Sequence, residues 1–460
     1  MIPTSILEAA LEKAVSTGAD YAEIFAENTT RGLVQLVNDN VKDALKEHSV
    51  GVGIRVFKGL RCAYACSSGL SAESVMSAAA KAAAAIAVSS EEKTIRLIDS
   101  TCANISPAAR IGSSIPLEDK IVLARRAYRA AREYSSEVSQ STVRLLDYDR
   151  NILIATSDGL KVSDRQVRSR ILINAVASAG SENQVGYIAP GASKGYEFFD
   201  EIDIEAAAAD AARQAVTMLH AGYCPAGRMP VAIDNGFGGV IFHEACGHSL
   251  EAESVSRGLS EFSGKLGQKV ASEKVTAIDD GTIPGAWGTV NIDDEGTPSR
   301  RRVLIENGIL KSYMVDKLNG RRMGIESTAS SRRQDYTFAP TSRMSNTFLA
   351  PGTDRDEDII KSIEYGLYAK KMGGGSVNPV TGEFNFAVNE GYIVRHGQIC
   401  EPVRGASLIG KGSEVIRNID MVGMNLRREQ GVCGASSGSV PTDVGQPMIR
   451  VSEITVGGRK

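Results

Sequence analysis

The 460-residue chain has few aromatic residues, no strong excess of either charge and no long apolar run. Aromatic side chains make up 5% of the sequence, so a surface that stacks nucleic-acid bases is not expected. A net charge of −3 argues against nucleic-acid binding by bulk electrostatics. No apolar stretch reaches the roughly 18 residues of a membrane-spanning helix. We therefore expect neither a membrane protein nor a nucleic-acid binder.

Cysteine is also sparse, with seven residues, an odd number, and no CxxC pair. This pattern favours reduced thiols in a reducing compartment. The first residues carry Glu8 and Glu12 and lack the basic flank of a secretory signal. The remaining composition is close to the globular average, and the length accommodates two or three domains. We expect a soluble cytoplasmic protein.

The first half of the chain alternates between helical and strand-like patterns. Apolar residues with a helical period predict helices at 5–17, 71–88, 117–134 and 202–220. Branched or alternating residues predict short strands between them, at 21–26, 33–37, 50–57, 61–65, 141–147, 152–157, 160–165 and 169–177.

A segment with Gly and Pro, 221–227, indicates a domain boundary. We expect residues 1–222 to form an α/β N-terminal domain. Residues 223–460 are expected to form a β-rich, α+β, mainly antiparallel C-terminal domain. Within it, Asn307-Gly308 and His396-Gly397 predict tight hairpin turns, and one short helix is expected at 356–369.

The chemically richest segment is a predicted helix that follows a short strand at 229–233 and a Gly-rich turn at 235–239. Two of the five histidines, His243 and His248, lie on it with Glu244 beside the first. A hydrolytic zinc site needs neutral imidazole ligands and a carboxylate near the attacking water that is not itself a ligand. A buried helix with two incidental histidines is the alternative, and the residues alone leave both open.

The spacing of the two histidines has a geometric consequence. Five residues at about 100° each turn a regular helix by roughly 140°, so the two imidazoles would diverge. They converge only if the helix widens into a π-bulge or breaks. Gly247, directly before His248, permits either.

The segment His243–His248 resembles the signature of the metal-bearing type within the TldD/PmbA peptidase family. The companion subunits of that family lack the histidine pair, so the chain resembles the catalytic type. The resemblance covers essentially the whole chain and is most specific after the boundary segment. Further blocks that resemble the family are 293–298, 373–375, 384–386, 431–434, 446–447 and 455–458.

The resemblance implies one Zn²⁺ per chain, held by His243, His248 and Cys433, with Glu244 as general base. Gly431 and Gly434 are expected to let the backbone bring the Cys433 thiolate near the metal. The resemblance also implies hydrolysis of peptide bonds in small or unfolded polypeptides. A dimer is implied as well, either a homodimer or a heterodimer with a metal-free PmbA/TldE-like subunit.

Two other functions are compatible with these residues. The first is a non-catalytic binding or assembly subunit of a TldD/PmbA-type complex, with structural zinc or none. Glu244 separates this alternative from a peptidase, because a structural site needs no base and usually has four protein ligands. The second is a zinc-dependent amidase or ester hydrolase, which would use the same residues.

Other motifs carry weaker signals. Ser193 lies in a G-x-S-x-G match that does not follow a strand into a helix, so a plain loop is favoured. Segment 405–411 resembles a P-loop but has Gly412 where Ser or Thr is required. Segment 291–296 resembles the start of a calcium loop, but Arg302 takes the place of the required Glu.

Cys246 lies close to the histidine pair, but a position on a buried helix face is favoured over a ligand role. Arginines recur in clusters in the second half of the chain. We expect solvated or salt-bridged surfaces there, with the alternative that one pair binds the carboxylate terminus of a substrate. The clusters are 300–302, 321–322, 332–333 and 427–428.

Overall fold

The computed structural model describes residues 2–90, 92–378 and 381–459. Over these residues the fold is α+β, and most strand pairs are antiparallel. Its helices are α1 Thr4–Val15, α2 Ala72–Ile86, α3 Leu117–Glu133, α4 Phe198–Glu201, α5 Ile204–Leu219, α6 Val240–Phe242, α7 Ala252–Val255, α8 Lys317–Met323, α9 Asp356–Lys361 and α10 Gly412–Val415. None of these described helices is long and apolar enough to cross a membrane.

The first half of the chain forms one sheet in the order β3-β2-β1-β5-β6-β4, with β7 and β8 also paired to β6. Among the described strands of this sheet only β4 pairs in parallel, so this half is antiparallel α+β instead of the expected α/β. The strands are β1 Tyr21–Val37, β2 Asn40–Lys58, β3 Arg61–Ser68, β4 Ile98–Ser100, β5 Val138–Thr156, β6 Leu160–Ala179, β7 Glu182–Ile188 and β8 Gly191–Ala192.

The strands of this sheet are longer than the sequence predicts. The expected strands 21–26 and 33–37 are both parts of β1, and β5 and β6 each join two expected strands in the same way. The polar residues between the apolar runs stay extended because they pair across the sheet, as Thr29 does with Arg150. Burial under the second half of the chain keeps Thr29 1% exposed.

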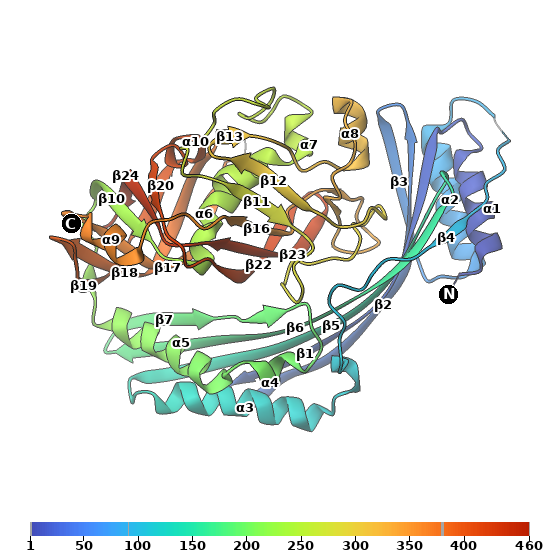
Figure 1. Ribbon diagram of the computed structural model, residues 1–460. Coiled ribbons are helices and arrows are strands. Elements are labelled where there is room, and N and C mark those ends of the chain that lie inside the picture. Colours follow the sequence, from blue (N-terminus) through green and yellow to red (C-terminus); the bar gives the residue numbers. More distant parts are fainter. Residues whose placement is uncertain (1, 91, 379–380, 460) are drawn as a thin grey trace.

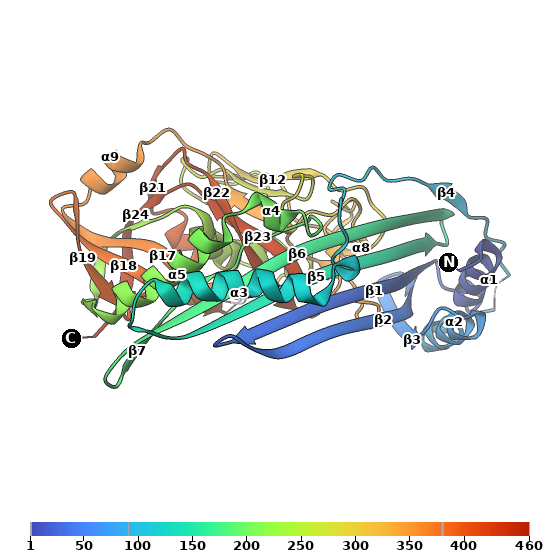
Figure 2. The ribbon, with the colours of Figure 1, turned by 90° about the horizontal axis from the view of Figure 1, so that it is seen from below.

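Helices cover this sheet at both ends (Figure 1). At one end, α1 and α2 pack on β1 and β2 through a core that includes Leu7, Leu11 and Ile54. At the other end, α3 and α5 lie side by side on one face of the sheet, as Figure 2 shows. The opposite face at that end is turned toward the second half of the chain.

The described residues of the second half form three sheets, and the proposed boundary at 222/223 falls within β9. The largest follows the order β17-β10-β24-β20-β18-β19-β9, with β21 on β24, and the next follows β13-β12-β11-β16-β23-β22. The bounds are β9 Gly222–Tyr223, β10 Gly227–Ile233, β11 Ala277–Asp280, β12 Arg301–Glu306, β13 Ile309–Leu310, β14 Ser331–Arg332, β15 Thr341–Ser342, β16 Asn346–Leu349, β17 Tyr365–Val377, β18 Glu383–Arg395, β19 Gln398–Arg404, β20 Ser407–Lys411, β21 Ile419–Val422, β22 Arg427–Ala435, β23 Gly438–Gln446 and β24 Ile449–Gly457.

Both predicted hairpin turns are confirmed. Asn307 and Gly308 have φ of 47° and 80° where β12 turns into β13. His396 and Gly397 have φ of 48° and 72° where β18 turns into β19.

The helix predicted over 356–369 is too long. It ends at Lys361, and Tyr365 begins β17. β17 pairs with β10 on one side and β18 on the other. Because Leu367 and Ala369 are fully buried in that sheet, the strand pairing overrides a weak helical period.

A buried group of charges joins the first sheet to the second half of the chain. One Glu23 oxygen accepts a hydrogen bond from Arg55 at 2.8 Å, and the other accepts one from Arg333 at 2.9 Å. Glu295 forms a further ion pair with Arg55. All four side chains are at most 1% exposed, so these pairs fix how the two halves pack.

Candidate metal centre

The histidine segment enters the core through a sequence of unlike helical turns. After β10, a 3₁₀ turn at Gly236–Gly239 leads into α6, then a π-helical turn at His243–Gly247 and a 3₁₀ turn at His248–Leu250. The five-residue histidine spacing predicts such a widened turn. A Cβ on Gly247 would lie 2.3 Å from Sδ of Met344, so the turn packs tightly against its surroundings.

The π-helical turn brings both imidazoles to Cys433 on β22. Nε2 of His243 and Nε2 of His248 each lie 3.3 Å from Sγ of Cys433. The two rings are 5.1 Å apart and nearly perpendicular, at 84°. Among the described residues these three donors form a group whose ligand atoms all lie within 4.8 Å of one another.

Carboxylates flank the second imidazole on two sides. The Nδ1–H of His248 donates to Oε2 of Glu251 at 2.9 Å, which leaves Nε2 of His248 directed at Cys433. Oε2 of Glu244 lies 3.8 Å from Nε2 of His248. The Glu244 side chain is 26% exposed, whereas that of Glu251 is 9% exposed. Glu251 is therefore placed to orient His248, and Glu244 is partly exposed to solvent beside the donors.

The three donors shift one another's protonation. Burial opposes ionisation of Cys433, but His243 and His248 outweigh burial and lower the pKa of the thiol to about 3. Burial opposes the charged form of His248, but Glu251 and Cys433 raise the pKa of its imidazole well above the usual value. The site thus holds Cys433 as a thiolate, the form that binds metal.

This donor set fits zinc. Zinc–ligand bonds of about 2.0–2.3 Å place two ligands of one tetrahedral ion roughly 3.4–3.6 Å apart, close to the two N–S distances in the site. Two imidazoles and a thiolate are also the ligand types that zinc prefers. Nδ1 of His243 is buried without a hydrogen-bond partner among the described residues, so the polar contact of this ring is the one from Nε2 to Cys433.

The expected role of the glycines near Cys433 is wrong. Cys433 lies in a regular antiparallel ladder opposite Val440. A Cβ on Gly434 would approach nothing closer than 3.9 Å, and one on Gly431 would lie 3.3 Å from the carbonyl of Thr442. The pairing of β22 with β23 therefore positions the thiol, and glycine is not required for it.

Cys246 is fully buried and lies outside the donor group, in agreement with the expected core position. The remaining histidines also lie outside it. His48 contacts Asn28 at 2.8 Å, His220 contacts Glu137 at 2.8 Å, and His396 pairs with Glu364 in its turn.

The weaker motifs prove to be structural. The Ser193 hydroxyl donates to the carbonyl of Trp287 at 3.4 Å, which is its only side-chain hydrogen bond within the described ranges. Asp293 accepts the backbone N–H groups of Glu295 and Thr297 at 3.0 and 2.9 Å, so segment 291–296 is a hydrogen-bonded turn.

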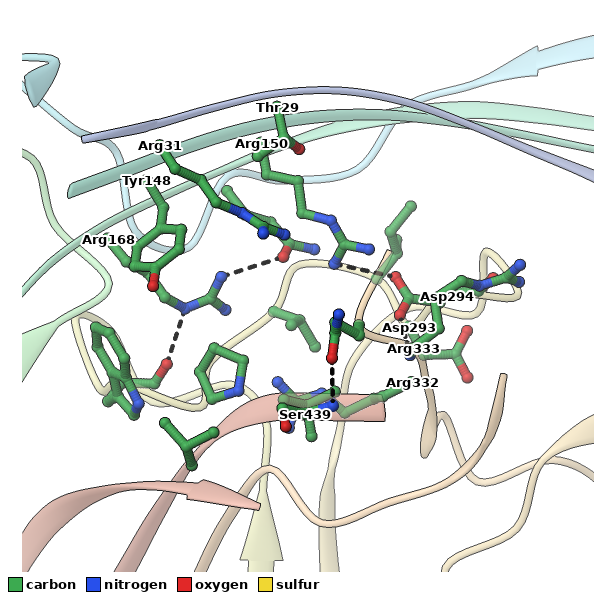
Figure 3. A pocket seen from close by; sticks show the side chains of 18 residues that line it. Thr29, Arg31, Tyr148, Arg150, Arg168, Asp293, Asp294, Arg332, Arg333 and Ser439 are labelled. Carbon is green, nitrogen blue, oxygen red and sulfur yellow. Dashed lines mark hydrogen bonds and ion pairs between the residues drawn. The ribbon is translucent and has the colours of Figure 1, made fainter. Parts of the chain in front are cut away.

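Several arginines expected at the surface are buried. Arg302, Arg332 and Arg333 are at most 5% exposed. Arg332 and Arg333 line a cavity beside β22 and β23, together with Arg31, Arg150 and Arg168 from the first sheet (Figure 3). Arg31, Arg150 and Arg168 lie in the polar central segments of β1, β5 and β6. Their period-two spacing is the sequence signal that would have revealed them, had those segments been recognised as strands.

Comparison with known proteins identifies relatives over nearly the whole chain. Sequence models of the PmbA/TldA metallopeptidase family match as domain 1 over 22–87, the central domain over 111–219 and the C-terminal domain over 226–458. A metalloprotease TldD homologue of Buchnera aphidicola is 35% identical, covering 98% of this chain and 95% of its own. A metalloprotease TldD homologue of Haemophilus influenzae is 36% identical, covering 95% of this chain and 93% of its own. A zinc metalloprotease TldD homologue of Saccharolobus solfataricus is 31% identical over 60% of this chain and 59% of its own.

Solved structures with the same fold are more distant in sequence. A Thermotoga maritima protein superposes with a TM-score of 0.81 at 20% identity, covering 98% of this chain and 99% of its own. TldE from Thermococcus kodakarensis superposes with a TM-score of 0.76 at 20% identity, covering 98% of this chain and 100% of its own. These similarities establish the fold.

Proposed function

The chain belongs to the PmbA/TldD metallopeptidase family, and from this membership we propose that it is a zinc-dependent peptidase. Its substrates are small or unfolded polypeptides, in which it hydrolyses peptide bonds. The observation that carries the proposal is the convergence of His243, His248 and Cys433 with Glu244 beside them. A peptidase centre needs such a carboxylate outside the ligand set.

One zinc ion per chain is held by Nε2 of His243, Nε2 of His248 and Sγ of Cys433. When bound, zinc supplies Lewis-acid chemistry at the coordination position that the three protein donors leave open. Glu251 holds one proton of His248 on Nδ1, so that Nε2 is the nitrogen that would give up its proton and offer a lone pair when metal binds. The low pKa of Cys433 keeps the thiol ionised over the whole physiological pH range.

Glu244 is the group that transfers a proton from the attacking water to the leaving amine. Its carboxylate has no hydrogen bond to any described residue and is partly open to solvent. It is therefore free to accept a proton from the attacking water and to deliver it to the leaving amine. The same residue argues against a purely structural zinc, which usually has four protein ligands and needs no base.

The surroundings favour an extended substrate. β22, which carries Cys433, lies at the edge of its six-stranded sheet. An extended peptide can add a strand at such an edge through backbone hydrogen bonds, largely independent of its sequence. Cys433 is 7% exposed and lies in the half of the chain that faces the first sheet, so a folded protein has little access to it. We further propose that the chain works as a dimer, with a second copy or a metal-free TldE-like companion.

The substitution Glu244→Gln tests the catalytic proposal. It removes the proton acceptor and keeps the size of the side chain, so we expect kcat for an unstructured peptide to fall by about 10²–10⁴-fold. Zinc content should stay unchanged, because Glu244 is not a ligand. Glu253→Gln is the matched control, since Glu253 lies nearby on α7 and pairs with Ser436 and Arg257. Full activity of Glu244→Gln at normal zinc content would refute the assigned role.

A further inference from the structure

The proposed reaction does not use the arginine-lined cavity between the first sheet and the second half of the chain. Its volume is about 330 Å³, within the roughly 300–1,000 Å³ range of small-molecule pockets. Five arginines and two aspartates contribute to its lining. Figure 3 shows Arg31, Arg150 and Arg168 entering from the strands of the sheet, while Arg332 and Arg333 lie on the opposite side.

The sheet presents these side chains in two neighbouring rows. Arg31 on β1, Tyr148 on β5 and Arg168 on β6 are cross-strand partners in one row. Two residues along each strand, Thr29, Arg150 and Gln166 form the next row in the same way. Residues two apart on a strand share a face, so both rows point into the cavity.

Two of the arginines are buried without an acidic hydrogen-bond partner. Arg168 is 4% exposed and donates to the carbonyls of Trp287 and Thr289 and to the side chain of Gln166. Arg332 is 5% exposed and donates to the carbonyl of Met344. Burial lowers the pKa of Arg168 to about 9 and that of Arg332 to about 10. Nearby arginines add to both effects, and Asp294 offsets them only in part. A negatively charged ligand would relieve this imbalance.

Two further arginines have donors to spare. Within the described ranges, the Arg31 guanidinium has no hydrogen bond and no ion pair, and it lies over the Tyr148 ring at 5.9 Å. Arg150 reaches Glu27 and Asp294 only at 3.5 and 3.7 Å, and its buried Nη2 has no hydrogen-bond partner. Unused guanidinium N–H groups at the wall of a cavity are suited to bind an oxyanion in a bidentate manner.

The cavity lies against the strand pair that carries the candidate ligand Cys433. Val432, the residue before Cys433, lines it, and so does Val440, the cross-strand partner of Cys433. Val432 is also 60% exposed, so this part of β22 is not covered by other side chains. An extended peptide at the β22 edge would therefore lie alongside residues that line the cavity.

We propose that this cavity binds a carboxylate group of the substrate peptide. The inference rests on the proposed peptidase function and assigns the arginine cavity as the subsite that anchors the chain next to the cleaved bond. The carboxylate belongs either to the C-terminus of the peptide or to an internal Asp or Glu side chain. The chemistry of recognition is the same for both.

Binding of matched peptides distinguishes these sources. A fluorescent peptide with a free C-terminus is compared with its C-terminal amide, and an internal Glu is compared with Gln. Anisotropy on zinc-loaded Glu244→Gln protein measures Kd without depending on cleavage. We expect one of the two carboxylates to tighten binding by about 10- to 100-fold, as for a charge-assisted hydrogen bond. The pair that shows this difference identifies the source.

A second substitution assigns the effect to the cavity. Arg31→Gln removes a guanidinium that makes no ion pair in the described structure, so folding should be preserved. We expect the preference for the carboxylate peptide to shrink to about threefold or less. Arg144→Gln is the matched control, because Arg144 lies on β5 of the same sheet, has a buried Nε without a partner and does not line the cavity. It should keep the full preference.

Equal affinity for every acid and neutral pair would overturn the carboxylate subsite, as would a preference that survives Arg31→Gln unchanged. These outcomes are separate from a failure of the peptidase proposal. In that case the wild-type zinc-loaded protein would cleave none of the peptides, while the binding comparison would still show whether the cavity selects a carboxylate.

Discussion

Glu251 is the side chain that sets the orientation and tautomer of His248. It accepts the Nδ1–H at 2.9 Å, and Nε of the buried Arg343 lies 3.9 Å from its other oxygen. Partners of this kind fix the ring of a ligating histidine and increase its basicity. The hydrogen bond therefore links the affinity for zinc to a residue that does not touch the metal.

Glu251→Gln should weaken zinc binding by about 10- to 100-fold without unfolding the protein. The amide still fills the space but is a poorer acceptor for the imidazole N–H. Competition with a chromophoric chelator measures the zinc Kd. Glu253→Gln, two residues along the chain, should bind zinc like the wild type. An unchanged Kd in Glu251→Gln would show that packing alone orients His248.

The sequence predicts the residues of the site unevenly. The pair His243 and His248 with Glu244 stands out because the three residues are close together and belong to the types that a zinc hydrolase needs. Cys433 lies 185 residues beyond His248, so no local spacing connects them, and only the family resemblance pointed to it. Glu251 and the cavity arginines of the first sheet, Arg31, Arg150 and Arg168, were not foreseen, since their roles depend on which strands and turns meet in space. The pair at 332–333 was one of four arginine clusters named as candidates for binding a substrate carboxylate, and the sequence did not single it out.

At the level of elements, the π-helical turn is held in shape by its neighbours. The first residue of α10, Gly412, packs directly on the carbonyl of Ala245, in the middle of the turn. The turn also contacts the side chain of Met344 at Gly247. Tight contacts on both sides compensate for the poorer geometry of a π turn and keep the two imidazoles converged.

Gly412→Ala should therefore disturb the site from a distance. The added Cβ would lie 2.0 Å from the Ala245 carbonyl oxygen, so the backbone must move. We expect a loss of about 1–3 kcal/mol in the free energy of unfolding, together with weaker zinc binding. Denaturant unfolding and chelator competition measure the two effects. Gly434→Ala, next to Cys433 but with free space for a Cβ, should change neither; equal zinc affinity in Gly412→Ala and wild type would contradict this account.

Element types were easier to predict than element lengths. The helices and hairpin turns follow from local signals such as apolar periodicity and Asn-Gly. The long strands β1, β5 and β6 were each predicted as two, because buried charged residues at their centres resemble loop segments. These charges are stable inside the protein only because the second half of the chain supplies partners, as the backbone N–H of Tyr336 does for Glu27. Such long-range pairing leaves no local trace in the sequence.

At the scale of the whole molecule, a half-buried ion pair joins Arg213 on α5 to the buried Glu390 on β18. Both oxygens of Glu390 accept hydrogen bonds from Arg213 at 2.9 Å, and Lys370 and Tyr392 donate to one of them. Burial opposes the charge of Glu390, but Arg213, Tyr392 and Lys370 together lower the pKa of the carboxyl to about 2. The pair connects the helix layer of the first half to the largest sheet of the second.

Stability should depend on pH through Glu390. Because its folded pKa lies below the unfolded value of about 4.3, the ionised form stabilises the protein above that pH. This contribution is lost as the pH falls from about 4.3 toward 2. Glu390→Gln should therefore lower the free energy of unfolding by about 2–4 kcal/mol at pH 7, and the difference from wild type should shrink on acidification.

Denaturant unfolding of both proteins between pH 3 and pH 7 measures this dependence. Glu401→Gln is the control, because its pair with Arg395 is exposed at the tip of the same hairpin, and we expect no measurable change. A difference for Glu390→Gln that stays constant down to pH 3 would contradict the assigned role of the charge.

The central claim is that one zinc ion binds to His243 and His248 of the π-helical turn and to Cys433 of β22. The most direct test is the zinc content of protein purified without a histidine tag or added metal, for wild type and Cys433→Ala. The account predicts about one zinc per chain in the wild type and a clear loss in Cys433→Ala. A wild-type chain without zinc, or a Cys433→Ala chain that keeps it in full, would contradict the three-donor site.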